Sequence, residues 1–128
     1  MRYLVDSDWV ADYLKGRAPA VELLDSLIGE GMAISIITYA EILEGTYFGR
    51  DPARSGAVFR RFLEGVAVRR VTSRIAERFA RISGELRGQG LLIPSPDLFV
   101  GTTAVQRRLI LVTRNRRHFE RIPGIQLL

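Results

Sequence analysis

Two short apolar runs constrain the fold of this chain more than any other feature of its sequence. One spans residues 33–37 (AISII) between Gly31 and Thr38, and the other is the aliphatic run that ends at Val112. Runs of this kind are typical of strands that are buried on both faces of a sheet. Segments with helical spacing lie between them, which indicates parallel strands joined by helices. The sequence therefore predicts an α/β fold, a three-layer α/β/α domain around a mostly parallel sheet of about four or five strands.

The spacing of the other apolar residues predicts the remaining elements. A first strand is expected over residues 2–5, a strand near a sheet edge over 66–71, and a candidate last strand over 125–127. Helices are expected over 8–16, from 19 to about 29, from 38 to about 48, after Asp51-Pro52, over 74–88 and from Ser95-Pro96 onward. The sequence contains no repeat or linker, so we expect residues 1–128 to form a single domain.

Composition narrows the class of protein. The absence of cysteine excludes disulfides and thiolate metal sites. The net charge of +5 comes from eighteen arginines and one lysine, and arginine is suited to bidentate contacts with phosphate. The sequence does not open on a basic segment with a long apolar run, and no apolar stretch could span a bilayer. We therefore expect a cytoplasmic protein with no membrane partner, for which a nucleic acid is one candidate anionic partner.

Polar side chains follow the predicted strands at one edge of the sheet. Asp6 ends the first strand, Thr38 follows the second, and Asn115 follows the aliphatic run. Open parallel sheets place their sites beyond the carboxyl ends of the strands. Glu41, one turn into a helix, and Asp97, at the start of another, are expected at the same edge. Sequence alone does not decide between Glu41 and Glu44, but the position nearer the strand end favours Glu41.

Each of these residues also has an ordinary structural explanation, and at this stage both explanations remain open. Asp6, Ser7 or Asp8 could cap the first helix. Thr38 and Glu41 match a capping box. Asp97 would complement a helix dipole after an N-cap at Ser95, and Asn115 suits a turn.

Taken together, Asp6, Glu41, Asp97 and Asn115 predict a metal site. Three carboxylates that lie close together are stable only if they take up protons or bind cations. Oxygen ligands without cysteine suit Mg²⁺ or Mn²⁺, which can activate water and neutralise charge on a phosphodiester. Arg114, Arg116 and Arg117 flank Asn115 and are candidates for contacts with a phosphate backbone. His118 could act as a general base, but a lone histidine beside Phe119 favours a surface or packing role.

Several motifs resemble those of PIN-domain ribonucleases, and most closely the VapC toxins of VapBC toxin–antitoxin modules. The resemblance runs in order along essentially the whole chain and rests on Tyr3-Leu4-Val5-Asp6-Ser7, Thr38-x-x-Glu41 followed by Gly45, Ile93-Pro94 ahead of Asp97-Leu98, and Leu111-Val112-Thr113-Arg114-Asn115 with His118-Phe119 and Ile122-Pro123-Gly124.

The resemblance implies a PIN fold and Mg²⁺- or Mn²⁺-dependent endonucleolytic cleavage of RNA. It also implies inhibition by a VapB-like antitoxin and, commonly, a homodimer. Asp6, Glu41 and Asp97 match the acidic metal ligands of the family, and Asn115 matches a fourth catalytic position that is often Asp. Asp8 and Thr113 are expected to support these ligands, and Arg114 and Arg116 to bind substrate.

Two other classes of protein share some of these sequence features. Asp6-Ser7-Asp8 also resembles the D-x-D motif of haloacid-dehalogenase-type phosphatases, but that chemistry needs a distal lysine, and the only lysine is Lys15. A non-enzymatic alternative is a basic module that binds nucleic acid or a protein partner and whose acids are all helix caps. Such a module would bind RNA equally well in EDTA.

Overall fold

The computed structural model describes residues 2–128 and has a four-stranded sheet at its centre, in which every strand is parallel to its neighbours. The strands lie in the order β3-β2-β1-β4 and span β1 (Tyr3–Val5), β2 (Met32–Ser35), β3 (Val66–Arg69) and β4 (Ile110–Val112). The prediction of an α/β fold with a mostly parallel sheet is therefore confirmed, as is the placement of the third strand at a sheet edge.

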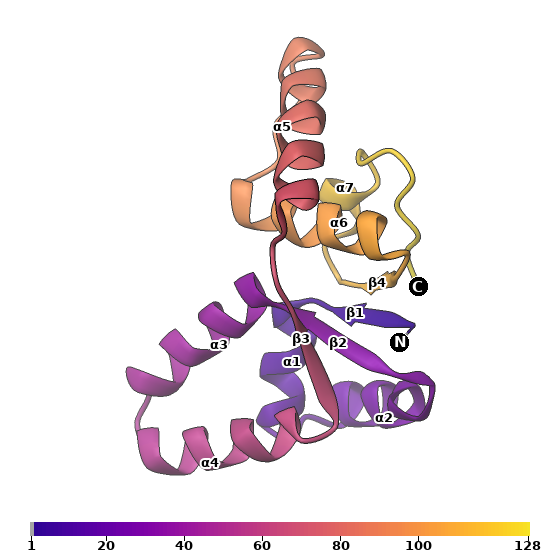
Figure 1. Cartoon of the computed structure of the whole chain (residues 1–128). Helices are drawn as coiled ribbons and strands as arrows, with labels where there is room; N and C mark the ends of the chain where they lie inside the picture. Colours follow the sequence, from indigo (N-terminus) through magenta and orange to yellow (C-terminus); the bar gives the residue numbers. More distant parts are fainter. Residues whose placement is uncertain (1) are drawn as a thin grey trace.

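Helices cover both faces of this sheet (Figure 1). In chain order they are α1 (Ser7–Leu14), α2 (Ala18–Leu27), the short 3₁₀ turn η1 (Ile28–Glu30), α3 (Ile36–Tyr47), α4 (Pro52–Leu63), α5 (Ser73–Gly88), α6 (Ser95–Arg107) and α7 (Arg116–Phe119). Asp51 caps α4 as its sequence predicts, because its carboxylate accepts a hydrogen bond from the Arg54 amide at 3.1 Å.

The alternation of side chains along the strands produces two hydrophobic cores. In β1, Tyr3 and Val5 point into a core shared with α1 to α4, whereas Leu4 points into a core shared with α5 to α7. The second core combines large side chains such as Leu98 and Phe119 with the small residues Ala33 of β2 and Ala104 of α6. The sheet is thus buried on both faces, which explains why its strands read as apolar runs.

Two predicted helix starts are wrong, and both errors have a local cause. Ser35 rather than Thr38 ends the second strand, and its hydroxyl accepts from the Ile37 amide at 3.1 Å, so α3 begins at Ile36. Thr38 is fully buried inside the first turn, and the predicted capping box with Glu41 is not formed. Similarly, the N-cap of α6 is Pro94 and not Ser95.

The candidate last strand is reduced to a single bridge between Leu111 and Leu127. Two backbone hydrogen bonds, from the Leu111 amide to the Gln126 carbonyl and from the Leu128 amide to the Leu111 carbonyl, hold the C-terminal segment beside β4. Their lengths are 2.8 and 3.0 Å.

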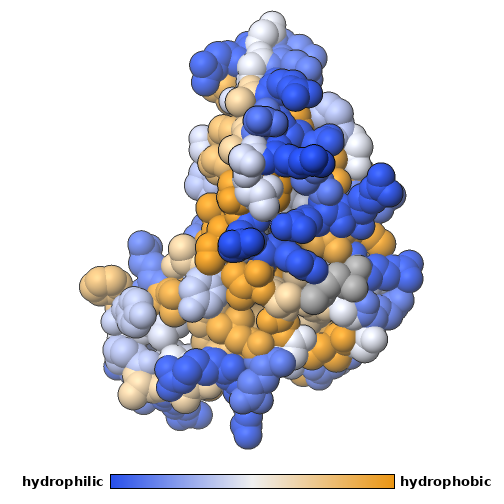
Figure 2. Space-filling view, in the orientation of Figure 1, coloured by the Kyte–Doolittle hydropathy of each residue, from blue (hydrophilic) through white to orange (hydrophobic). Residues whose placement is uncertain are grey.

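Figure 2 shows that hydrophobic side chains gather in the recess between the α5 arm and the lower helices on this face of the molecule.

Candidate active site

Asp6 lies at the carboxyl end of β1, one of the two central strands of the sheet. Its backbone amide donates to Val112 of β4 at 2.9 Å, and its side chain is only 6% exposed. One carboxylate oxygen accepts from the Ser7 amide at 2.9 Å, and the other accepts from the Thr113 hydroxyl at 2.8 Å. Asp6 is therefore the N-cap of α1 as well as a member of the strand-end cluster, so the two explanations do not exclude each other.

Burial and neighbouring charge both disfavour the ionised form of Asp6. Its pKa is raised above the ordinary value of an aspartate, mainly by burial and further by the charges of Asp97 and Asp8. The hydrogen bonds from Thr113 and Ser7 act in the opposite direction. A buried carboxylate surrounded by like charge is a group that gains from a nearby cation.

Glu41 is exposed on α3 and belongs to the same electrostatic cluster. Its pKa is raised by partial burial and then by the charges of Asp6, Asp97 and Asp8, while the Ser7 side chain lowers it. These interactions place Glu41 at the carboxyl edge of the sheet. Glu44 lies three residues further along α3 and away from the strand end.

A second group of polar side chains lies beside the first. Asp97 is in the first turn of α6, and its Oδ2 atom is 3.5 Å from Asn115 Nδ2 and 3.1 Å from His118 Nδ1. The Asn115 Nδ2 and His118 Nδ1 atoms are 2.7 Å apart. The Thr113 hydroxyl also accepts from the Asn115 amide at 3.0 Å, which fixes the start of α7. The structure therefore brings Asp97 and Asn115 together, in keeping with the expectation that both lie at one edge of the sheet.

His118 is a member of this group that the sequence reasoning did not find. We expected a surface or packing role, whereas its ring nitrogen contacts Asp97 and its side chain is 34% exposed. The available signal was its spacing: Asn115 caps α7, and a residue three positions later returns to the same side of a helical turn.

Two of the three arginines that flank Asn115, Arg114 and Arg116, are already engaged within the protein. Arg114 donates to Asp12 at 2.6 Å and lies 4.0 Å from the centre of the Trp9 ring. Arg116 donates to the Leu128 carbonyl at 2.7 Å and pairs with Glu120 at 3.7 Å. Arg114 lowers the pKa of Asp12, chiefly through that hydrogen bond. Substrate binding by Arg114 and Arg116 stays a prediction.

The oxygen atoms at this edge are ligands that suit a hard divalent ion, although the side chains do not surround a single point. Within residues 2–128 no three His, Asp or Glu side chains converge into a ready metal site. The pKa values of Asp6 and Glu41 are nevertheless raised, first by burial and further by the like charges of this group of carboxylates. An ion between them would remove this repulsion, so these residues fit the predicted cofactor.

Comparison with known proteins identifies the class to which this fold and site belong. Residues 3–125 match the model of the PIN domain, so the chain belongs to the PIN domain family. Ribonuclease VapC1 of Methanocaldococcus jannaschii is 33% identical over 126 residues, which cover 98% of this chain and 85% of that protein. The tRNA(fMet)-specific endonuclease VapC of Salmonella typhimurium is 28% identical over 127 residues, covering 99% and 96%. The DNA-bound VapBC structure from Salmonella typhimurium has a TM-score of 0.90 at 28% identity, covering 100% and 97%.

Within that family the chain is a VapC-type ribonuclease, the toxin of a type II VapBC toxin–antitoxin system. The phosphatase and non-enzymatic alternatives are thereby set aside. Nucleases of this family are typically metal-dependent. No helix within residues 2–128 has the length and apolar character needed to cross a membrane.

Proposed function

We propose that this chain hydrolyses phosphodiester bonds of RNA with Asp6, Glu41 and Asp97 as the ligands of Mg²⁺ or Mn²⁺. The observation that carries the proposal is the position of the buried Asp6, which Thr113 and Asn115 link to Asp97 and which lies close enough to Glu41 for the two charges to interact. A bound ion supplies positive charge beside the scissile phosphate and makes water easier to deprotonate. Because the proposed substrate is cellular RNA, we expect the protein to act in the cytoplasm.

The surrounding residues have supporting parts in this proposal. Thr113 and the Ser7 amide hold the Asp6 carboxylate in a fixed orientation. Asn115 completes the site beside Asp97, and Asp8 adds negative charge to the cluster. Arg114 and Arg116 contact the phosphate backbone of the RNA, for which both side chains are exposed.

The most direct test measures cleavage of RNA by the purified chain. Initiator tRNA and an unrelated structured RNA are incubated with the protein in Mg²⁺, in Mn²⁺ and in EDTA. We expect cleavage with either ion and none in EDTA, and we expect Asp97→Asn to lose cleavage while it remains folded by circular dichroism. Glu77→Gln, which alters an exposed acid on α5, is the matched control. An Asp97→Asn protein that cuts as fast as wild type would refute the site assignment.

A paired comparison resolves the choice between the two glutamates of α3. Glu41→Gln removes a charge that interacts with Asp6 and Asp97, whereas Glu44→Gln alters an exposed acid one turn further away. The first change is expected to abolish cleavage and the second to leave it near the wild-type rate. A greater loss from Glu44→Gln would overturn the choice.

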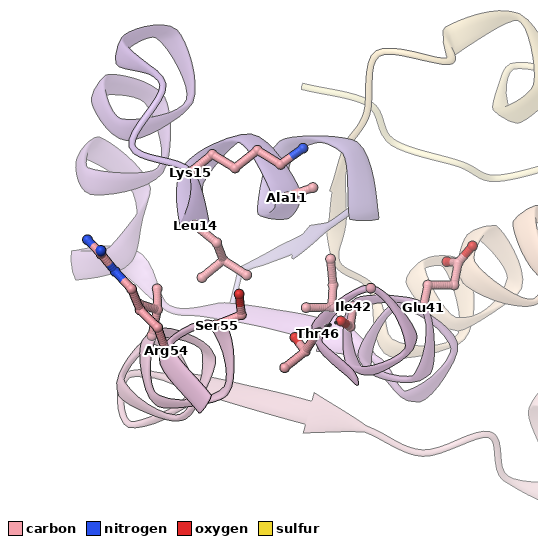
Figure 3. Close-up of a pocket in the computed structure, with 10 residues that line it drawn as sticks. Ala11, Leu14, Lys15, Glu41, Ile42, Thr46, Arg54 and Ser55 are labelled. Carbon is pink, nitrogen blue, oxygen red and sulfur yellow. Dashed lines mark hydrogen bonds between the residues drawn. The ribbon is translucent and has the colours of Figure 1, made fainter. Parts of the chain in front are cut away.

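We also propose two protein partners. A VapB-like antitoxin would occupy the cleft of about 380 Å³ between α1, α3 and α4, which is lined by both apolar and polar side chains and has Glu41 at one end (Figure 3). A second copy of the chain would cover the apolar recess beside α5 (Figure 2). Light scattering on the purified chain, alone and with its antitoxin, measures both associations.

A further inference from the structure

Three polar atoms from separate side chains converge at the outer side of the proposed site. Asp97 Oδ2, His118 Nδ1 and the Asn115 amide group lie at mutual distances of 2.7, 3.1 and 3.5 Å. The Asp97 and His118 side chains are 29% and 34% exposed, so the cluster is open to water and to a hydrated ion.

No single arrangement of protons satisfies all three contacts as they stand. If His118 Nδ1 carries a hydrogen, it donates to Asp97 but then opposes the amide nitrogen of Asn115 at 2.7 Å. If Nδ1 is bare, it accepts from Asn115 but its lone pair faces the Asp97 carboxylate at 3.1 Å. Each choice satisfies one contact at the expense of another.

Turning the Asn115 amide over removes this conflict in two ways: a proton on His118 Nδ1 can be shared by the two oxygens, or a cation can be bound by all three groups. Oxygen and nitrogen of an amide occupy nearly the same positions, so the orientation is set by its partners. With the Asn115 amide turned, the cluster presents three lone-pair donors: the Asp97 carboxylate oxygen, the Asn115 amide oxygen and the His118 imidazole nitrogen. Ligands about 2.1 Å from an octahedral ion are about 3 Å apart, which is the scale of the separations in this cluster.

We propose that His118 Nδ1 is a metal ligand beside Asp97 and the Asn115 oxygen, and that it makes the site prefer a first-row transition ion over Mg²⁺. This inference rests on the proposed metal-dependent function. Mg²⁺ favours oxygen ligands, whereas imidazole is a good ligand for the transition series. Two further acids, Asp6 and Glu41, add negative charge to the cluster through Asp97.

Three of the neighbouring arginines are held by groups outside this cluster. Arg116 is held by the Leu128 carbonyl and by Glu120, and Arg114 is held by Asp12. Arg121, on the following loop, donates to the Leu92 carbonyl at 3.1 Å. The negative charge of Asp97 is therefore shared only with the Asn115 and His118 side chains among these groups.

Because His118 is the only histidine, its ring nitrogens can be observed without ambiguity. Long-range ¹H–¹⁵N spectra of the full chain are recorded during titration with Zn²⁺, a diamagnetic member of the series. We expect the Nδ1 resonance to move to the shift of a metal-bound nitrogen at one equivalent, and the change to be absent in Asp97→Asn. Zn²⁺ binding that depends on Asp97 but leaves Nδ1 unchanged would overturn the inference.

Affinity measurements test selectivity in a second way. Free Mn²⁺ is followed by electron paramagnetic resonance, with Mg²⁺ as the competitor. His118→Ala is expected to weaken Mn²⁺ binding about tenfold or more and Mg²⁺ binding by no more than about twofold. His118→Asn, which keeps a hydrogen-bonding group but lacks the imidazole, should also shift the preference toward Mg²⁺. Glu120→Gln, at the C-cap of the same short helix, is the matched control.

The outcomes separate this inference from the function on which it rests. If His118→Ala and His118→Asn keep the wild-type ratio of Mn²⁺ to Mg²⁺ affinity while the protein still cuts RNA, only the role of His118 is refuted. If the wild-type chain binds neither ion and cuts RNA equally in EDTA, the metal-dependent function is refuted and the inference with it.

Discussion

The two halves of the candidate site differ in how their polar groups are held. In the inner half, Asp6 is buried and both of its carboxylate oxygens accept hydrogen bonds from fixed donors. In the outer half, Asp97, Asn115 and His118 are partly exposed, and their contacts depend on how the Asn115 amide and the protons of His118 are arranged. The inner half is thus preorganised by the sheet, whereas the outer half is free to rearrange around a ligand.

Thr113 connects the two halves. Its hydroxyl donates to the Asp6 carboxylate and accepts from the Asn115 amide, so one side chain after β4 orients both groups. The carboxyl edge of the sheet thus holds its polar groups in place, whereas the polar groups of the helices that follow are more loosely held. Substitutions in the inner half, in the packing behind the outer half and at Thr113 test this division, and the loss of the Asp6 charge is expected to cost the most activity.

The largest effect is expected from Asp6→Asn, because it removes the charge of the inner half. RNA cleavage should fall by roughly 10² to 10⁴-fold, the scale of a lost catalytic group. The amide oxygen can still cap α1, so the protein should remain folded. Asp25→Asn, an exposed acid on α2, is the control, and cleavage by Asp6→Asn at more than a tenth of the wild-type rate would count against Asp6 as a ligand.

The same variant has a pH signature in the absence of metal. Because burial raises the pKa of Asp6 in the folded protein, its contribution to stability is fully present below the pKa of the unfolded chain and is lost as pH rises through the folded pKa. Metal-free wild type should therefore lose stability from about pH 4 upward, and Asp6→Asn should lose less. Urea unfolding in EDTA at several pH values measures this. Parallel pH curves for the two proteins would contradict the expectation.

The next effect is on the packing that supports the outer half. A Cβ at Gly101 of α6 would overlap Ile122 Cδ1 and approach the Phe119 ring at 3.1 Å. Gly101→Ala should therefore destabilise the protein by about 1–3 kcal/mol and displace α7 with His118. Gly84→Ala is the matched control, because its Cβ meets nothing within 4 Å and alanine favours a helix by about 0.5–1 kcal/mol. Denaturant unfolding of both variants measures the contrast, and equal stabilities would contradict it.

A smaller effect is expected when the link between the halves is cut. Thr113→Val keeps the shape but leaves one Asp6 oxygen and the Asn115 amide without their partner, at a cost of about 1–2 kcal/mol. The pKa of Asp6 should rise further, because the Thr113 hydrogen bond lowers it, and the acidic limb of the pH–rate profile should move to higher pH. Thr113→Ser, which retains the hydroxyl, should behave as wild type. An unchanged profile for Thr113→Val would show that the hydroxyl does not act on Asp6.

Much of the fold could be predicted because it follows from patterns in single segments. The apolar runs around Ala33 and Leu111 predicted parallel strands, and Asp51-Pro52 predicted a helix start. The start of α3 was misplaced because Ser35 lies inside an apolar run, and a serine hydroxyl can cap a helix as well as threonine does. Local pattern alone does not decide between such neighbouring caps.

The site was less accessible to sequence reasoning, because its contacts join segments far apart in the chain. The strand ends indicated that Asp6 and Asn115 meet at one edge, but not that Thr113 contacts both. His118 was missed because its place depends on how α7 turns back over α6, which Gly101 permits. The partners of Arg114 were also unpredictable, since Asp12 is 102 residues away in sequence.

The smallest effect is expected from a substitution of Arg114, which lies outside both halves of the site. Its guanidinium is fixed by Asp12 and by the Trp9 ring, so it offers a preorganised cation for phosphate at the rim of the site. Arg114→Ala should weaken RNA binding a few-fold, raise KM more than it lowers kcat, and reduce the salt dependence of binding by roughly one phosphate contact. Arg17→Ala, which removes the other arginine paired with Asp12, is the control. If both variants keep the wild-type salt dependence, Arg114 holds α1 in place through Asp12 and does not contact the substrate.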